Sequence, residues 1–307
     1  MRNGVKRYQC QECDHIFYGQ RKEHQKILTN ILEDYIFHKQ THEELTRKYQ
    51  RDRHVLQEAI HDAVLTPKLH IPRSIHLIVD ATYFGERKDD SVWCVLVGRD
   101  PRQKENLVWR FEHTETTYGY ALLREELERL GYTILSVTGD GFSGIRSAFQ
   151  GIPFQMCQVH MERLVIEGTT RNPLTEAGQV LLALVRSLPV THSHLFTERL
   201  RHFAEKYQSF LNEKTTHPFT GDWSYTHEGV RSAYLSLFRL RKYLFTYEHD
   251  HAIPKTTNSI EGHFRHVKRH LGSHSGLTQK HQQKILAVIL QASSVSPSKE
   301  VIDELWK

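Results

Sequence analysis

The chain has 307 residues, a formal net charge of +5 at pH 7 and a hydrophobic fraction of 38%. This length allows one large domain and a smaller one, and the modest positive charge fits a polyanionic partner without requiring one. No run of about eighteen apolar residues and no apolar signal-peptide core occur in the sequence, so we expect a cytoplasmic protein with no membrane partner.

The first residues contain Cys10 and Cys13, whose spacing lets both thiolates bind one tetrahedral Zn²⁺ ion. A zinc ribbon needs two such pairs, and the chain shows only one. Either an upstream pair is missing, or His15 and His24 complete a different site, or no zinc binds. We therefore expect a partial zinc-ribbon knuckle over residues 1–22, with Zn²⁺ as a candidate ion.

The next segment, residues 23–66, has the spacing of three helices over 23–39, 41–49 and 52–64. Thr41 and Glu44 have the spacing of a capping box, which predicts the start of the second helix. The last two helices fit a helix-turn-helix that binds DNA, although an ordinary helical hairpin fits equally well. The DNA-facing residues of this region would be Arg51, Arg53, His54 and Gln57. Two prolines then predict a linker over residues 67–74.

From Ile75 the pattern changes to strands, expected over 75–83, 91–98 and 106–113 with turns between them. A helix over 118–131 follows, then a strand over 132–138, a short helix over 143–149 and a strand over 153–157. This order is typical of a ribonuclease-H-like α/β fold, in which three antiparallel strands join two parallel ones. We assign residues 75–160 to the first part of this core and residues 253–307 to its C-terminal helices.

Two acidic residues occupy the places where the first and fourth strands of such a sheet are neighbours. Asp80 lies between apolar residues of the first strand, and Asp140 follows the fourth strand between two glycines. An ionised carboxylate is costly on a buried strand unless a cation pairs with it, and two adjacent carboxylates repel each other. Oxygen ligands of this kind select Mg²⁺ or Mn²⁺, so the pair predicts a divalent metal site.

A third acidic residue, Glu261, lies on a predicted helix with a basic face. Asn258 is a suitable N-cap, with Glu261 at the capping-box position, although an ordinary solvated helix would show the same pattern. Glu261 would complete a site for two metal ions about 4 Å apart, the arrangement that supports in-line phosphoryl transfer. The candidate DNA contacts near this helix are Asn258, Arg265, Lys268 and Arg269.

About 120 residues separate Asp140 from Glu261, too many for one connection in a bare core, so residues 161–252 must form an insertion. Its patterns are helical, which predicts an all-α insertion. Trp223 and Phe238 could stack on nucleic acid there, but packing in the core is the preferred interpretation. Just before the insertion, Cys157 and His160 fit a buried structural pair near the site better than a metal site, because zinc prefers four ligands.

Four short sequences resemble a DDE transposase of the Mutator-like group of bacterial insertion sequences: VDAT at Asp80, TGDG at Asp140, CQVH from Cys157 to His160, and TTNSIEG at Glu261. The resemblance extends from about Ile75 to Leu290. It implies that Asp80, Asp140 and Glu261 are the catalytic acids and ligands of two Mg²⁺ or Mn²⁺ ions. It also implies a protein of the bacterial nucleoid that binds double-stranded DNA, both terminal inverted repeats and target DNA, as a homodimer.

The leading hypothesis is a transposase that cuts element ends by metal-dependent hydrolysis and joins the freed 3′-hydroxyl to target DNA. A catalytically silent DNA-binding regulator is one alternative, favoured by the incomplete zinc ribbon and disfavoured by the presence of all three acids. A ribonuclease-H-like nuclease is another, and the insertion and the N-terminal DNA-binding region argue against it.

Overall fold

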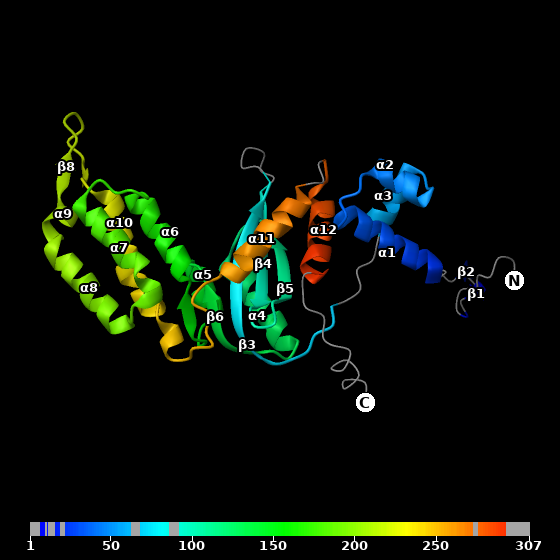
Figure 1. The fold of residues 1–307 in the computed structure, drawn as a ribbon, viewed down its shortest axis with the longest axis horizontal. Coiled ribbons are helices and arrows are strands. Elements are labelled where there is room, and N and C mark those ends of the chain that lie inside the picture. The colour runs from blue at the N-terminus through cyan, green and yellow to red at the C-terminus, as the bar shows by residue number, and fades with distance from the viewer. Residues whose placement is uncertain are drawn as a thin grey trace. The chain divides into compact units, whose positions relative to one another are not determined.

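The computed structural model describes residues 7–9, 11, 16–18, 22–62, 68–85, 92–272 and 276–292. Contacts between Cα atoms divide these residues into two compact units (Figure 1). One contains the N-terminal elements together with residues 265–272 and 276–292, and the other contains residues 70–264. No helix in the described ranges is both long enough and apolar enough to cross a membrane.

The N-terminal unit begins with two short antiparallel strands, β1 (Arg7–Gln9) and β2 (Ile16–Tyr18), and continues with helices. The helices are α1 (Lys22–Ile36), α2 (His42–Tyr49), α3 (Arg53–Asp62), the end of α11 (Asn258–Leu271) and α12 (Gln279–Ala292). The predicted capping box of α2 is confirmed, since Glu44 N–H donates to Thr41 Oγ1 and Thr41 N–H donates to Glu44 Oε2. Helices α1, α2 and α3 pack pairwise against one another, and the helix-turn-helix remains a prediction.

The second unit is built on a mixed five-stranded sheet in the order β5-β4-β3-β6-β7. Strands β3 and β4 are antiparallel, as are β4 and β5, whereas β6 runs parallel to both β3 and β7. This topology is compatible with the ribonuclease-H-like sheet expected from the sequence. The strands are β3 (Ser74–Phe84), β4 (Trp93–Asp100), β5 (Glu105–Glu112), β6 (Thr133–Gly139) and β7 (Phe154–Met156).

Burial explains why the central strands form. Every residue of β4 is buried, and in β3 the residues Ile75, Leu77 and Val79 enter the core that α4 (Thr117–Arg129) covers on one side of the sheet. Helix α4 begins after Thr116, whose hydroxyl accepts the N–H of Gly119. The short helix α5 (Ser143–Ala148) packs against α4 and connects β6 to β7.

After β7 the chain forms a bundle of helices, seen at the left of Figure 1. It consists of α6 (Gln158–Thr169), α7 (Glu176–Arg186), η2 (Leu188–Val190), α8 (Ser193–Lys206), α9 (Gln208–Asn212), α10 (Glu228–Leu240), η3 (Arg241–Tyr243) and η4 (Thr246–Glu248). Helices α6 and α10 cross closely at Gly168 and Gly229, where a Cβ on Gly168 would lie 2.4 Å from the carbonyl oxygen of Gly229. The two glycines therefore set how near these helices come.

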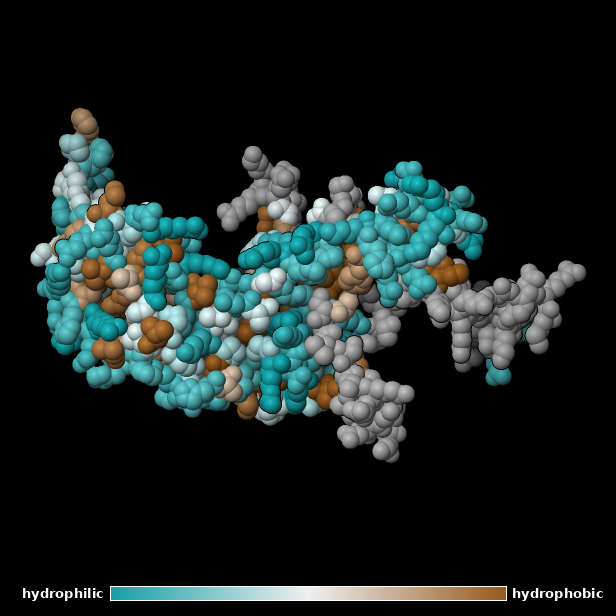
Figure 2. All heavy atoms as spheres, viewed as in Figure 1, coloured by the Kyte–Doolittle hydropathy of each residue, from teal (hydrophilic) through white to brown (hydrophobic). Residues whose placement is uncertain are grey.

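The all-α prediction for residues 161–252 is wrong in one place, because a hairpin of β8 (Lys214–Thr216) and β9 (Trp223–Tyr225) interrupts the helices. All three residues of β8 are exposed, so the strand has no buried face to produce alternating hydrophobicity. The hairpin loop contains Phe219, which is 93% exposed, and Figure 2 shows hydrophobic surface at its end. Trp223 and Phe238 are 55% and 44% exposed, which corrects the expectation that they pack in the core.

Candidate metal-binding active site

Parallel pairing of β3 and β6 positions two of the three predicted acids. Ile78 pairs with Thr138 in the strand register, and Asp80 and Asp140 each follow their paired residue by two positions. Asp80 Oδ1 accepts the N–H of Ala81 at 2.9 Å, and Asp140 Oδ1 accepts the N–H of Phe142 at 2.9 Å. The hydrogen bond to Phe142 closes the turn into α5, so the start of that helix orients the Asp140 carboxyl group.

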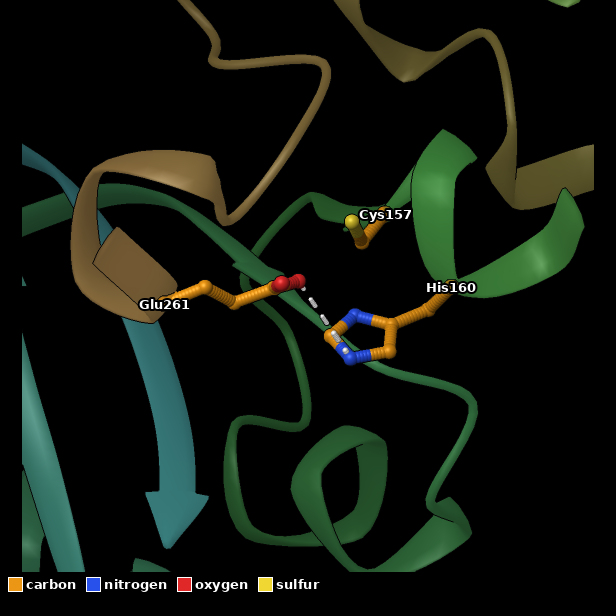
Figure 3. Close-up of side chains that lie close together, drawn as sticks. All are labelled: Cys157, His160 and Glu261. Atoms are coloured by element: carbon orange, nitrogen blue, oxygen red, sulfur yellow. Dashed lines mark ion pairs between the residues drawn. The ribbon is translucent and has the colours of Figure 1, made fainter. Parts of the chain in front are cut away.

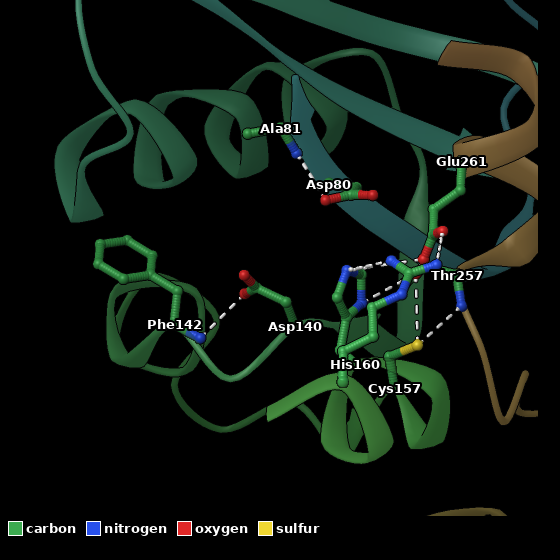
Figure 4. Close-up of polar contacts among 9 residues, drawn as sticks. Asp80, Ala81, Asp140, Phe142, Cys157, His160, Thr257 and Glu261 are labelled. Atoms are coloured by element: carbon green, nitrogen blue, oxygen red, sulfur yellow. Dashed lines mark hydrogen bonds and ion pairs between the residues drawn. The ribbon is translucent and has the colours of Figure 1, made fainter. Parts of the chain in front are cut away.

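The carboxyl group of Asp80 is electrostatically coupled to the rest of the site. Its pKa is raised to about 7: burial is the largest cause, His160 and the Ala81 N–H oppose it, and the charges of Asp140 and Glu261 add to it. A buried carboxyl group with acidic neighbours favours a bound cation, because only a cation relieves both the burial cost and the repulsion. Figure 4 shows the carboxyl groups of Asp80, Asp140 and Glu261 arranged around the imidazole ring of His160.

The third acid comes from the start of α11, one turn after Thr257. The prediction that Asn258 caps this helix is wrong by one residue: Asn258 is already helical, and the carbonyl of Thr257 accepts the N–H of Glu261 at 3.1 Å. Thr257 is fully buried, and its hydroxyl lies 3.3 Å from Glu261 Oε1. The threonine hydroxyl therefore helps to orient the glutamate side chain.

Helix α6 supplies three side chains to the same place at helical spacing. Arg163 Nη2 donates to Glu261 Oε2 at 2.5 Å, and His160 Nε2 lies 3.6 Å from Glu261 Oε1. Cys157 precedes the helix, is fully buried, and accepts the N–H and the hydroxyl of Thr257 at 3.3 and 3.4 Å. These contacts tie the segment before α11 to the start of α6.

The Cys157 and His160 side chains shift each other's protonation. Burial alone would lower the pKa of His160, but the hydrogen bond and charge of Cys157, together with Asp80 and Glu261, raise it to about 9. Burial alone would raise the pKa of Cys157, but hydrogen bonds from His160 and Thr257 lower it. The pair thus brings a thiol of lowered pKa beside an imidazole of raised pKa, next to the acids.

Sequence reasoning missed three polar residues of the site: Arg163, Thr257 and Glu115. Arg163 could have been found, because it follows His160 by three positions on a predicted helix. Glu115 lies just before α4, where Tyr120 donates its hydroxyl to Glu115 Oε1 at 2.6 Å. Burial raises the pKa of Glu115, and the charge of Asp140 adds to this, so Glu115 lies within electrostatic range of the catalytic candidates.

Most of the predicted DNA contacts are exposed. Arg51, Arg53 and His54 are exposed around the start of α3, where His54 Nε2 lies 3.5 Å from Glu58 Oε1, and Gln57 is half-buried. Asn258, Arg265, Lys268 and Arg269 are exposed on α11. Cys10 and Cys13, the candidate zinc ligands, lie outside the described residues.

The donor set of the three acids fits a hard divalent cation. Aspartate and glutamate oxygens are the ligands that Mg²⁺ and Mn²⁺ prefer, and the raised pKa of Asp80 marks a place where positive charge is favourable. Asp80, Asp140 and Glu261 would hold such an ion. Arg163 and His160 both pair with Glu261, and within the described part of the chain no ion pair joins a basic side chain to Asp80 or Asp140.

Comparisons with known proteins find similarity among solved structures. No family model matches the sequence, and no curated protein matches it. Among solved structures, the chain is similar to one in the Drosophila P element transposase strand transfer complex, with a TM-score of 0.42 and 12% sequence identity. The match covers 89% of this chain and 92% of that chain. The score and the identity are too low to assign this chain a fold or an activity.

Proposed function

We propose that this protein is a DDE transposase of an insertion sequence, similar to the Mutator-like group, with a ribonuclease-H-like catalytic core. The observation that carries the proposal is the convergence of three acids from elements far apart in the sequence. Asp80 comes from β3, Asp140 from the end of β6 and Glu261 from α11, and the pKa of Asp80 responds to both of the others. Such convergence on a mixed sheet is chemically suited to phosphoryl transfer on nucleic acid.

Mg²⁺ or Mn²⁺ ions, two in the proposed site, would supply activation of the attacking oxygen and neutralisation of the leaving oxygen when bound. The protein's own residues do the positioning. The Ala81 and Phe142 backbone N–H groups orient Asp80 and Asp140, and Arg163 and Thr257 orient Glu261. Asp80 is partly buried on the central strand β3, and the lower local dielectric there strengthens its interaction with a cation.

The proposed substrate is double-stranded DNA, first the terminal inverted repeats and then a target. Exposed Arg51, Arg53 and His54 at the turn before α3 are the proposed readers of the repeats, with Gln57 beside them. Arg265, Lys268 and Arg269 on α11 are proposed phosphate contacts, together with Asn258 at the start of that helix. Because both element ends must be cut, we propose a homodimer on DNA, with Zn²⁺ at Cys10 and Cys13 supporting end recognition.

The test uses the purified protein, Mn²⁺ or Mg²⁺, and labelled duplexes that carry the ends of the element encoding it. The wild type is expected to nick these ends and to join them to a target plasmid. Asp80→Asn, Asp140→Asn and Glu261→Gln should each abolish both steps while end binding persists, and Asp222→Asn on the exposed hairpin is the matched control.

Three outcomes would overturn the proposal. Cleavage retained by Asp80→Asn would remove the catalytic assignment. End binding without any cleavage by the wild type would favour the regulator. Cleavage of an RNA–DNA hybrid in preference to the DNA ends would favour the nuclease.

A further inference from the structure

A group of three ligands of a softer kind shares Glu261 with the three acids, so an ion bound there would compete for that carboxylate with an ion at Asp80 and Asp140. Cys157, His160 and Glu261 each offer one ligand atom, and these atoms all lie within 4.8 Å of one another (Figure 3). We call these residues the Cys-His-Glu cluster. Its sulfur and nitrogen atoms distinguish it chemically from the oxygen-only set of Asp80 and Asp140.

The cluster matches the ligand preferences of zinc. Zn²⁺ binds thiolate sulfur, imidazole nitrogen and carboxylate oxygen at about 2.0 to 2.3 Å in tetrahedral geometry, whereas Mg²⁺ avoids sulfur. Ligand atoms around such an ion lie roughly 3.5 Å apart. His160 Nε2 and Glu261 Oε1 already lie 3.6 Å apart, and all three ligand atoms lie within 4.8 Å of one another, so binding requires the side chains to close in around the ion.

The surroundings hold these side chains in place and leave one oxygen available. Arg163 occupies Oε2 of Glu261, so Oε1 faces the cluster. The hydroxyl of Thr257 lies 3.3 to 3.4 Å from Cys157 Sγ, His160 Nδ1 and Glu261 Oε1, so it can accept from His160 Nδ1–H and donate its one proton to either Cys157 or Glu261. The Gln158 N–H also donates to the carbonyl of Lys255 at 3.0 Å, which joins the backbones of α6 and the segment before α11. Metal ligands are commonly oriented by hydrogen bonds of this kind.

We propose that Cys157, His160 and Glu261 bind one Zn²⁺ ion, with the fourth position open to water or to an oxygen of a bound ligand. Three protein ligands and one open position are the arrangement of catalytic rather than purely structural zinc sites. The thiolate and the carboxylate balance the charge of the ion, and Arg163 remains paired with the outer oxygen of Glu261. This proposal goes beyond the transposase activity and does not depend on it, because it concerns the free protein.

The test is a titration with Co²⁺, which replaces Zn²⁺ and gives a charge-transfer band when it binds a thiolate. The parent protein carries Cys10→Ser and Cys13→Ser, so that Cys94 and Cys157 are its two remaining thiols. One equivalent of Co²⁺ is expected to produce the band, and Zn²⁺ is expected to displace it. Cys94→Ser is the matched control and should keep the band, because Cys94 is buried in β4 outside the cluster.

Variants of the cluster then identify the ligands. Cys157→Ser should abolish the charge-transfer band. His160→Gln and Glu261→Gln should each weaken Zn²⁺ binding by more than about 100-fold, which is more than the loss of a residue that only supports a ligand usually causes. Thr257→Val should weaken it by about tenfold, as expected for such a supporting residue. If Cys157→Ser does not fold, the band in the parent and its loss in the partly exposed His160→Gln decide the question.

Two results would overturn the zinc site: no cobalt–thiolate band in a folded parent protein, or a band that survives in His160→Gln and Glu261→Gln. Failure of the proposed transposase function would look different. Asp80→Asn and Asp140→Asn should retain the cobalt band whether or not they affect DNA cleavage, because neither residue belongs to the cluster.

Discussion

Arg163 Nη2 lies 2.5 Å from Glu261 Oε2, although 98 positions separate the two residues in the sequence. The other oxygen of Glu261 faces His160 and Thr257. The third candidate acid is therefore held by basic side chains of α6. A divalent cation at the acidic site must share Glu261 with this arginine, and this competition can be measured.

Arg163→Gln is expected to tighten Mn²⁺ binding at the three acids by about two- to tenfold, because a positive charge next to a ligand is removed. The free energy of unfolding should change by less than about 1 kcal/mol, since Arg163 is half-exposed. Electron paramagnetic resonance of free Mn²⁺ measures the affinity. Arg186→Gln is the matched control. Arg186 lies on α7, is as exposed as Arg163, and pairs with Glu162 of α6, the helix that carries Arg163. Weaker Mn²⁺ binding in Arg163→Gln would instead mean that the arginine is needed to position Glu261.

Asp80→Asn should stabilise the metal-free protein at alkaline pH. Because burial and then Asp140 and Glu261 raise the pKa of Asp80 to about 7, the folded state binds more protons than the unfolded state between about pH 4 and pH 7. Stability from this group is present at low pH and lost as the pH rises through that window. In EDTA at pH 8 the free energy of unfolding of the variant should exceed that of the wild type by roughly 1 to 4 kcal/mol.

The measurement is urea denaturation at several pH values, and the difference between variant and wild type should shrink as the pH falls from 8 toward 4. Asp222→Asn, on the exposed hairpin, should show no such trend. A constant difference across the range would contradict the raised pKa of Asp80.

Gly168→Ala should destabilise the second unit by about 1 to 3 kcal/mol, because the added methyl group would lie 2.4 Å from a backbone oxygen of Gly229. Gly262→Ala on α11 is the matched helical change, and its methyl group would meet no atom within 4 Å. It should stabilise by up to about 1 kcal/mol through helix propensity. Thermal and urea unfolding of both variants measure the change in the free energy of unfolding. Equal changes in the two variants would mean that α6 and α10 can move apart at little cost.

Arg73→Met should destabilise the sheet unit by about 3 kcal/mol, since it removes the arginine that pairs with two buried carboxylates. Arg73 Nη2 lies 2.8 Å from Asp100 Oδ2 and 2.6 Å from Glu105 Oε2. Arg110→Met is the comparison, because Arg110 pairs with Glu112 at a partly exposed position and should cost less than about 1 kcal/mol. If urea denaturation shows similar losses in the free energy of unfolding for the two variants, the buried ion pairs of Arg73 are no more stabilising than the exposed one of Arg110.

The sequence by itself predicted the sheet well, because the evidence for strands is local. Ile75, Leu77 and Val79 alternate along β3, and nearly every residue of β4 is apolar, so the strands were placed within about two residues of their observed ends. The order of elements also predicted that the middle of the first strand and the end of the fourth would be neighbours, which brings Asp80 on β3 near Asp140 after β6.

The remaining features depend on contacts between distant parts of the chain. The pairing of Arg163 with Glu261 and the position of Thr257 arise only when α6 and α11 meet, and no local pattern encodes that meeting. The exposed strands β8 and β9 lack a buried face, so the hydrophobic pattern could not predict them. Local periodicity thus determined the strands and the two aspartates, whereas tertiary packing decided which basic and sulfur-containing side chains surround the third acid.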